Sequence, residues 1–487
     1  MPLEHLPNEI IETILSHLAL HDIRNFRLTS RASASTSSHH FKSFLRRKHV
    51  DVTESSLRSF LQATNPGHIG SFVTDVVLVG VVNNPKWLNR RIKDPTDGHK
   101  CDMPGVGPEG QARAQADLDL LMQRQRDYER MRATGTDVTL LAEAFTNLMV
   151  PNHDERPGLR SLTLEVVVYR LDAEQRLPPA DGGSWTLIWQ AAAATFHTAM
   201  RALAASQMPL QELDVYSHLS RCSLACTELS AVDIESNGLT ASLASLRSLS
   251  ISFSDRIVDM RKHHFDITGD SADDVDWGDP AQDEERSDDE IEAELLDTSN
   301  FTGLARFLHR CTALEDLELH VFKLITSGLD NLYVRRDAYL HSILAINTPF
   351  PYLRRLTLRG VRARGPDLLA FIKALPIREL RMVNVKLLVG TFAPIFDYCV
   401  SHEAALERLY LDDLFDPNPL AHVYFDGETG KPTRIDFKRP CSNLLERTGM
   451  DVRRAIPYFT PVGTRLTENP RARRMWKWRR RAEYGPP

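Results

Sequence analysis

Cysteine and histidine pairs are the residues of this sequence whose types could hold a metal ion. Cys222 and Cys226 stand four positions apart with no second pair nearby, whereas a structural zinc site needs four ligands. The pairs at 39–40 and 263–264 are adjacent histidines, and adjacent residues do not share a helical face. We therefore expect no metal and no other cofactor.

Two glycine-rich stretches could hold phosphate groups. GVGPEG at 105–110 fits G-x-G-x-x-G, but no strand precedes it and Pro108 interrupts it. GETGKP, from Gly427, is too short for a phosphate loop, and its Lys431 precedes Pro432 rather than Ser or Thr. No G-x-S-x-G nucleophile motif occurs. We predict that the protein is not an enzyme, although the long insertions leave room for a hidden one.

The composition narrows the class of protein further. The chain has 487 residues, of which 42% are hydrophobic and 25% charged, with a net charge of −6; these values are typical of a soluble globular protein without a global charge that would attract nucleic acid or membranes. Six scattered cysteines form no disulfide framework. The start has no signal-peptide pattern, and the apolar stretch 184–207 is Ala-rich and interrupted by polar residues. We expect a cytoplasmic or nuclear protein, or both, that does not enter a membrane.

One hydrophobic pattern recurs along most of the chain. L-x-x-L-x-L appears seven times in one orientation, with a weaker eighth copy at Val73; the seven begin at Leu159, Leu210, Leu246, Leu314, Leu353, Ile377 and Leu406. Alternation sends the fourth and sixth residues to one face of a short strand. Helical stretches are predicted before most of these strands, at 138–148, 185–205, 301–309, 339–346, 367–375 and 392–400.

This pattern resembles leucine-rich repeats. The resemblance implies an α/β fold, an irregular solenoid with a parallel concave sheet and convex helices. A doubly wound α/β sheet accounts for alternating helices and strands but not for the repeated leucines. The uneven steps between copies place insertions in the early part of the array.

The first thirty residues follow a different period. LPNEIIETILSHLALHDIRNFRLTSR, from Leu6, carries apolar residues that form one helical stripe from Ile10 to Leu18, and Asp22 can cap a second helix. A third helix is predicted through Phe41 and Phe44, giving a three-helix bundle. Burying five aliphatic side chains yields on the order of 8–15 kcal/mol, while ordering the backbone costs about 1–2 kcal/mol per residue. Such a unit gains from contacts outside itself.

These residues resemble an F-box in order and spacing, through Leu6-Pro7, Glu9-Ile10, Ile14, Leu18, Asp22-Ile23 and Leu28 to Arg31. The resemblance implies a substrate-recognition subunit of a ubiquitin ligase that docks on a Skp-type adaptor and, through it, on cullin, without an active site of its own. Ser33 departs from the family, which often has an aromatic residue there. Six residues match the apolar adaptor-facing pattern, some of which would be internal core: Leu6, Pro7, Ile10, Ile14, Leu18 and Ile23.

Two alternatives stay open at this point. The opening helices fit an ordinary N-terminal cap on a larger fold, and the repeat body fits a protein-interaction scaffold unrelated to ubiquitin. The domain boundaries we expect are 1–50 for the F-box, 51–464 for the repeats, with a loop insertion at 83–110 and an acidic disordered insertion at 270–298, and 465–487 for a basic tail.

The acidic insertion and the C-terminal tail carry charges of opposite sign. Residues 270–297 hold 14 acidic residues against Arg286 alone, which predicts a solvated loop or, if Ser271 or Ser287 is phosphorylated, a regulatory segment. The tail has seven basic residues between Arg471 and Arg481 with two tryptophans among them. Such a segment could bind nucleic acid or act as a nuclear localisation signal. We favour instead a terminal helix that packs on the last repeat, and we expect no nucleic-acid partner.

The concave strand surface is where a protein target of unknown identity is expected to bind. Strand alternation predicts that several polar and aromatic residues point outward there; the candidates are Tyr216, His320, Arg359, Arg381, Tyr410 and Asp412. Charge reversal at Arg359 together with Arg381 is predicted to weaken target binding without unfolding the array.

Overall fold

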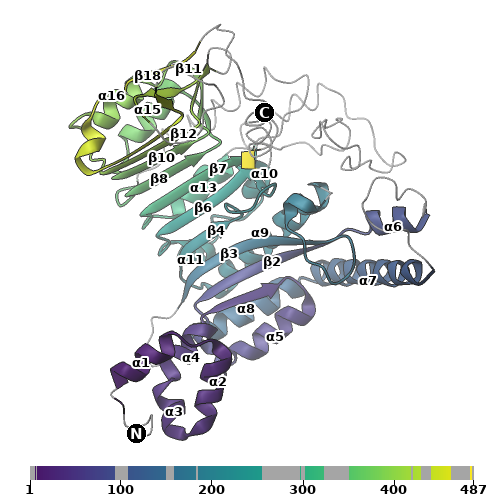
Figure 1. Cartoon of the computed structure of the whole chain (residues 1–487). Helices are drawn as coiled ribbons and strands as arrows, with labels where there is room; N and C mark the ends of the chain where they lie inside the picture. Colours follow the sequence, from purple (N-terminus) through teal and green to yellow (C-terminus); the bar gives the residue numbers. More distant parts are fainter. Residues whose placement is uncertain are drawn as a thin grey trace.

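A computed structural model shows four short helices followed by a large mixed sheet lined with helices (Figure 1). It describes residues 6, 8–93, 108–149, 158–182, 185–254, 297, 302–322, 350–417, 421–428, 440–461 and 483–484. The opening helices are α1 (Asn8–Ser16), α2 (Leu20–Thr29), α3 (Arg31–Thr36) and α4 (Ser38–Leu45). The predicted third helix, through Phe41 and Phe44, is α4, and the bundle has a further helix, α3, that was not predicted and that meets α4 at Ser37.

The large sheet has eleven strands within the described residues, and most neighbouring strands run parallel in chain order. The parallel strands along its path are β1 (Arg47–Asp51), β2 (Asp75–Asn83), β3 (Leu159–Tyr169), β4 (Leu210–Val215), β6 (Ser248–Ser254), β7 (Asp316–Phe322), β8 (Arg355–Arg359), β10 (Glu379–Val383) and β12 (Arg408–Asp412). β5 (Leu224–Ala225) pairs with β6, and β17 (Leu444–Thr448) closes the path antiparallel to β12. The expected mixed α/β architecture and its parallel-rich sheet are therefore present.

The repeated leucines stack across this sheet in register. Leu213, Leu249, Leu317 and Leu356 are consecutive partners on β4, β6, β7 and β8, and each is at most 2% exposed. Each copy of the pattern therefore contributes a rung to one continuous core.

Helices cover the leucine face, because their apolar side chains belong to the same core. They are α5 (Glu54–Thr64), α8 (Thr136–Leu148), α9 (Trp185–Ser206), α10 (Cys226–Ser230), α11 (Asn237–Leu243), α13 (Thr302–Arg310), α15 (Gly365–Lys373) and α16 (Ala393–Val400). Five of the six predicted helical stretches coincide with α8, α9, α13, α15 and α16 to within a few residues. The sixth, 339–346, lies outside the described residues.

The described residues also form two small sheets and three 3-10 turns. One small sheet joins β14 (Ala421–His422), β13 (Phe415–Asp416), β11 (Lys386–Val389) and β9 (Arg362–Arg364), and the other joins β16 (Cys441–Ser442), β15 (Tyr424–Asp426) and β18 (Tyr458–Phe459). The turns are η2 (Ile69–Phe72), η4 (Pro179–Asp181) and η7 (Gly449–Arg453).

The segment 83–110, predicted to be a loop, is partly helical. It contains α6 (Lys86–Lys93) and the first residues of α7 (Pro108–Ala133). Leu88 of α6 is fully buried against Leu118 and Leu121 of α7, in a cluster separate from the main core. The charged and Pro/Gly composition hid this short apolar stripe. The acidic insertion 270–298, apart from Asp297, and the tail 465–487, apart from Glu483 and Tyr484, lie outside the described residues.

The opening helices join the sheet directly. Only Arg46 separates α4 from β1, and its carbonyl accepts hydrogen bonds from the backbone N–H groups of Thr74 (3.0 Å) and Asp75 (2.9 Å). The Lys42 ammonium lies 4.2 Å from the centre of the Phe72 ring, a favourable cation–π distance. The helices are therefore fixed to the sheet by the backbone and by a side-chain contact.

Among the helices that the structure describes, none combines the length and the apolar character needed to span a membrane.

Candidate functional site

The opening helices share a very small core. Ile11, Leu15 and Ile23 are at most 5% exposed, and partly buried Leu6, Leu18, Phe26 and Phe41 pack around them. Three buried aliphatic side chains are a small contribution for a unit of this length. A core this small is the reason why the sequence leads us to expect that the unit gains from contacts outside itself.

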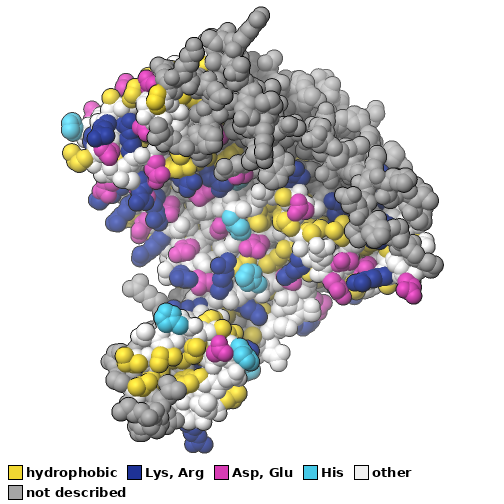
Figure 2. All heavy atoms as spheres, in the orientation of Figure 1, with side chains coloured by type: hydrophobic (Ala, Val, Ile, Leu, Met, Phe, Trp, Pro, Cys, Tyr) yellow, Lys and Arg dark blue, Asp and Glu magenta, His cyan; other side chains and the backbone are white. Residues whose placement is uncertain are grey.

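The same helices leave large apolar side chains in contact with solvent. Ile10 and Ile14 of α1 are 48% and 39% exposed, and Leu28 and Phe44 are 85% and 44% exposed. Residues 10 and 14 lie one turn apart on one stripe, next to the stripe through 11 and 15 that faces inward. Figure 2 shows hydrophobic side chains gathered over this domain. An exposed apolar surface on so small a unit is typical of a contact site for another protein.

The structure separates the candidate adaptor-facing residues. Ile10 and Ile14 are on the open surface, and Leu6 and Leu18 lie half-buried at the edge of the core. Ile23 is 0% exposed and is therefore one of the six that form internal core; it extends from α2 and belongs to the same core cluster as Ile11 and Leu15 of α1. Pro7 lies outside the described residues.

Two exposed residues were not among the candidates. Leu28 was used in the sequence only for the F-box resemblance and Phe44 only for a helical pattern, although both are exposed. The sequence could have indicated them, because it holds more large apolar residues than a core of three buried side chains can enclose.

Hydroxyl groups replace an aromatic residue where α2 meets α3. Ser33 is 5% exposed, and its Oγ receives a hydrogen bond from Thr29 Oγ1 (3.1 Å) and lies 2.9 Å from Ser30 Oγ. Its backbone N–H donates to Ser30 Oγ, which caps α3. The position that departs from the F-box pattern is therefore filled by a polar, hydrogen-bonded cluster.

The second candidate surface is the polar face of the large sheet, on the side opposite the leucines. One row of paired residues crosses it from β3 to β12, and every member is partly or fully exposed: Thr163, Asp214, Ser250, Glu318, Thr357, Arg381 and Tyr410. Strand alternation therefore predicts this row correctly.

Arginine side chains dominate the later part of this face. The Arg381 guanidinium lies 4.6 Å from the centre of the Tyr410 ring. Arg355, Arg378 and Arg408 are 56–59% exposed and each pairs with a carboxylate. Figure 2 shows Lys and Arg side chains crowded over β8, β10 and β12. This region can therefore bind a partner that carries carboxylates or aromatic rings.

Three candidates on this face are buried instead of exposed. Tyr216 is 0% exposed: its φ of 61° follows the end of β4 and breaks the alternation, and its hydroxyl donates to Ala192 O (2.8 Å). His320 is 1% exposed because Tyr484 covers it. Asp412 is 4% exposed where β17 closes the sheet. Their predicted exposure is wrong, since each lies where a loop or a later segment folds over the strand end.

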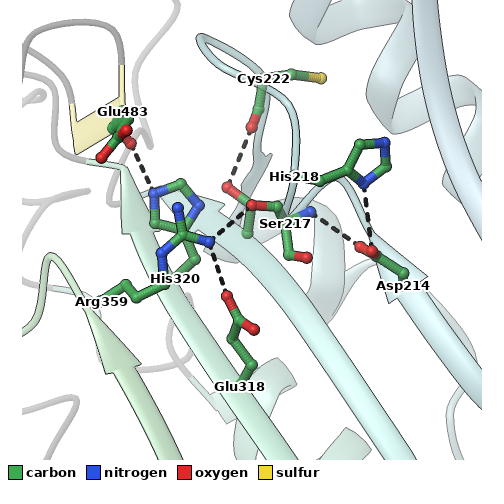
Figure 3. Close-up of polar contacts among 9 residues, drawn as sticks. Asp214, Ser217, His218, Cys222, Glu318, His320, Arg359 and Glu483 are labelled. Carbon is green, nitrogen blue, oxygen red and sulfur yellow. Dashed lines mark hydrogen bonds and ion pairs between the residues drawn. The ribbon is translucent and has the colours of Figure 1, made fainter. Parts of the chain in front are cut away.

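Arg359 is also held within the structure. Its Nη1 donates to Glu318 Oε1 (2.7 Å) and to Ser217 O (2.9 Å), and its side chain is 21% exposed (Figure 3). It thereby ties β8 to the loop after β4, which lies beyond two intervening strands. Arg359 therefore holds β8 and this loop together, and little of its side chain is left for a partner to contact.

A second charged group lies beside that loop. The imidazole of His218 is 3.2 Å from Asp214 Oδ2 and 3.4 Å from Glu165 Oε1. Its hydrogen bond to Asp214, followed by that to Glu165, raises the pKa of His218 to about 9. His218 is therefore a cation at neutral pH and offsets the acidic start of the row.

Metal-ligand geometry is absent among the residues that the structure describes, where no group of three His, Cys, Asp or Glu side chains could hold an ion. Cys222 and Cys226 are both buried.

Comparison with known proteins identifies one part of the chain. The family model for the F-box domain matches residues 3–45, the stretch that ends with α4. No curated protein matches the chain.

Proposed function

We propose that this chain, whose residues 3–45 form an F-box domain, is the substrate-recognition subunit of a Skp–cullin–F-box ubiquitin ligase. F-box domains typically bind Skp-type adaptors, and such subunits are generally non-catalytic. The observation that carries the proposal is the combination of this match with the solvent-exposed Ile10 and Ile14 on α1.

Ile10 and Ile14 are the proposed centre of the adaptor contact, and Leu28 and Phe44 are further exposed apolar side chains of the same domain. Covering a side chain of this size stabilises a complex by about 1.5–3 kcal/mol when burial is complete. Leu6 and Leu18, half-buried around the small core, remain proposed contacts, as does Pro7 on the sequence pattern alone, and Ile23 supports the surface from inside.

The adaptor contact can be tested by capture on a purified Skp-type adaptor. We expect Ile10→Asp/Ile14→Asp to weaken binding at least about a hundredfold, because two aspartates would have to be desolvated in an apolar contact. Met450→Asp is a matched control, since Met450 is an apolar side chain that is 85% exposed at the other end of the sheet. Equal capture of the double variant and the wild type would contradict the proposal, and capture of none of the three would favour a scaffold unrelated to ubiquitin.

The body of the chain is proposed to be a leucine-rich-repeat solenoid whose concave face carries the target-binding surface. The parallel strands in chain order and the stacked leucines support this assignment. Arg381 and Tyr410 are the proposed contacts on its later part, because both are at least partly exposed and already form a cation–π pair that a partner can extend. The arginines around them favour a target with an acidic surface.

Target binding can be tested by collecting ubiquitylated proteins from cells after proteasome inhibition. We expect Arg381→Glu/Tyr410→Ala to lose proteins that the wild type enriches, while adaptor binding is unchanged. Arg130→Glu is the matched control, because Arg130 of α7 is 73% exposed and also pairs with a carboxylate. The same set of enriched proteins for all three would exclude this surface.

A further inference from the structure

Two residues from the end of the sequence lie on the polar face of the sheet. Glu483 contacts His320 of β7, from which it is 163 positions away along the chain (Figure 3). Tyr484 packs against the same imidazole and lies beside Gly360, which follows β8. Tyr484 is only 7% exposed. A residue so far along the chain therefore buries its ring on the surface where a target is proposed to bind.

The contacts of this pair are those of a bound peptide. His320 Nε2 lies 2.6 Å from the backbone carbonyl oxygen of Glu483. The Tyr484 ring meets the imidazole edge-on, with 5.5 Å between ring centres. The Arg359 guanidinium lies near enough to the Tyr484 side chain to interact with it electrostatically. One carbonyl and one phenol are recognised, both of which any tyrosine-containing segment can present.

A glycine opens the space that the ring occupies. Gly360 follows β8 with φ of +71°, and a Cβ added there would lie 2.3 Å from Val321 O and 2.9 Å from Tyr484 Cδ1. Both the backbone conformation and the closeness of the ring therefore require glycine at this position.

With Tyr484 in place, the polar groups around its ring are held in one arrangement. Burial, with the nearby Arg359 charge, lowers the pKa of His320 to about 3, so the imidazole is neutral and its Nε2–H can donate to a carbonyl. Arg359 is held in place by Glu318 and by the carbonyl of Ser217. Among the described residues, the His320 Nδ1 atom is buried without a hydrogen-bond partner.

We propose that His320, Arg359 and Gly360 form a tyrosine-binding site, that Tyr484, whose backbone is helical, fills it in the free protein, and that targets enter it with a tyrosine of their own. This inference rests on the proposed target-binding role of the sheet face. Because Tyr484 belongs to the same chain, it competes at an effective concentration of about millimolar. A target tyrosine must therefore bind with its neighbouring contacts to displace it.

The site fits an unmodified tyrosine better than a phosphorylated one. The Arg359 guanidinium is already paired with Glu318, whose carboxylate would lie close to a phosphate on the phenol. The ligand class is therefore a peptide segment with an unmodified tyrosine.

A labelled heptapeptide of residues 481–487, RAEYGPP, provides the test in a fluorescence-polarisation assay with the full-length chain. We expect Tyr484→Ala to bind it at least about tenfold more tightly than the wild type, because the variant has vacated the site. A peptide with Ala in place of the tyrosine should not bind, and a phosphotyrosine peptide should bind at least about tenfold more weakly than RAEYGPP. Equal binding of RAEYGPP to wild type and Tyr484→Ala, or no binding to either, would overturn the proposal.

Tyr484→Ala/His320→Phe separates recognition from folding. The phenylalanine keeps the volume of the imidazole but has no N–H for the peptide carbonyl, so we expect RAEYGPP binding to fall at least about tenfold relative to Tyr484→Ala. Equal unfolding midpoints of the two variants would show that the fold is intact, and unchanged peptide binding would overturn the role of His320. Neither adaptor nor target is present in this assay, so its failure leaves the adaptor capture result unaffected.

Discussion

The F-box domain and the large sheet handle their apolar side chains in opposite ways. The helices α1–α4 bury three aliphatic side chains and expose Ile10, Ile14, Leu28 and Phe44. The sheet buries its leucines almost completely and presents a polar face on which arginines and carboxylates are paired. A small unit has too little interior to hide its own apolar residues, so its surface is suited to a hydrophobic contact, while the sheet offers charge and hydrogen bonds.

The strongest test of this comparison removes a rung from the leucine stack. Leu317→Ala in β7 is expected to lower the free energy of unfolding by about 3–5 kcal/mol, because it leaves a cavity between fully buried neighbours on β6 and β8. Urea unfolding would measure the change. Thr357→Ala, on the polar face of the adjacent strand, is the control and should change stability by less than about 1 kcal/mol.

The next test compares the two stripes of the F-box helices. Ile23→Ala removes one of three core side chains and is expected to cost the domain about 2–4 kcal/mol. Ile10→Ala should cost less than about 0.5 kcal/mol because its side chain is about half exposed. Amide hydrogen exchange would show faster exchange in α1–α4 for Ile23→Ala with the sheet unchanged; equal effects of both variants would contradict the division into inner and outer stripes.

A third test distinguishes two arginines on the polar face. Arg359→Ala should lower the free energy of unfolding by about 2 kcal/mol, since it leaves the partly buried Glu318 without its pair and Ser217 O without a donor. Arg381→Ala should cost less than about 1 kcal/mol, because it loses only a cation–π contact at an exposed site. Urea unfolding of both variants would measure these costs. A larger loss of stability for Arg381→Ala than for Arg359→Ala would contradict the view that Arg359 holds the structure together and Arg381 is free to contact a partner.

The smallest effect concerns His218 and pH. Its pKa is raised to about 9 from 6.5, so its contribution is fully present below about pH 6.5 and is lost as pH rises through about 9. Because the side chain is 43% exposed, solvent screening reduces this contribution to about 1 kcal/mol. Between pH 6 and pH 10, the free energy of unfolding measured in urea should fall by about 1 kcal/mol more for the wild type than for His218→Gln. If the wild type instead gained stability relative to the variant over this range, the charged His218 would not be stabilising.

Much of the fold could be predicted because its apolar residues recur at the regular spacings of strands and helices. Each complete L-x-x-L-x-L copy, such as that from Leu159, coincides with a strand of the large sheet. β1 was not foreseen, since RKHVD has no leucine period. α7 was not foreseen because few of its residues, namely Ala114, Leu118, Leu121 and Met131, are buried along a largely polar helix.

The candidate sites were predictable to a lesser degree. Alternation places Arg381 and Tyr410 correctly because both lie inside strands. It fails for Tyr216, which comes after a strand and has a left-handed φ, and for His320, which a segment distant in sequence covers. In the F-box, the sequence contains the apolar residues but not the direction of each; only packing distinguishes Ile10 from Ile11.

The join at Arg46 has a mechanical consequence. Because its carbonyl is bonded to the backbone of Thr74 and Asp75, and no spacer separates α4 from β1, the F-box cannot swing independently of the sheet. In the proposed ligase role, the distance from the adaptor to the bound target is then set by the fold and not by a flexible linker. Only target lysines at a matching distance from the F-box would come within range of the incoming ubiquitin.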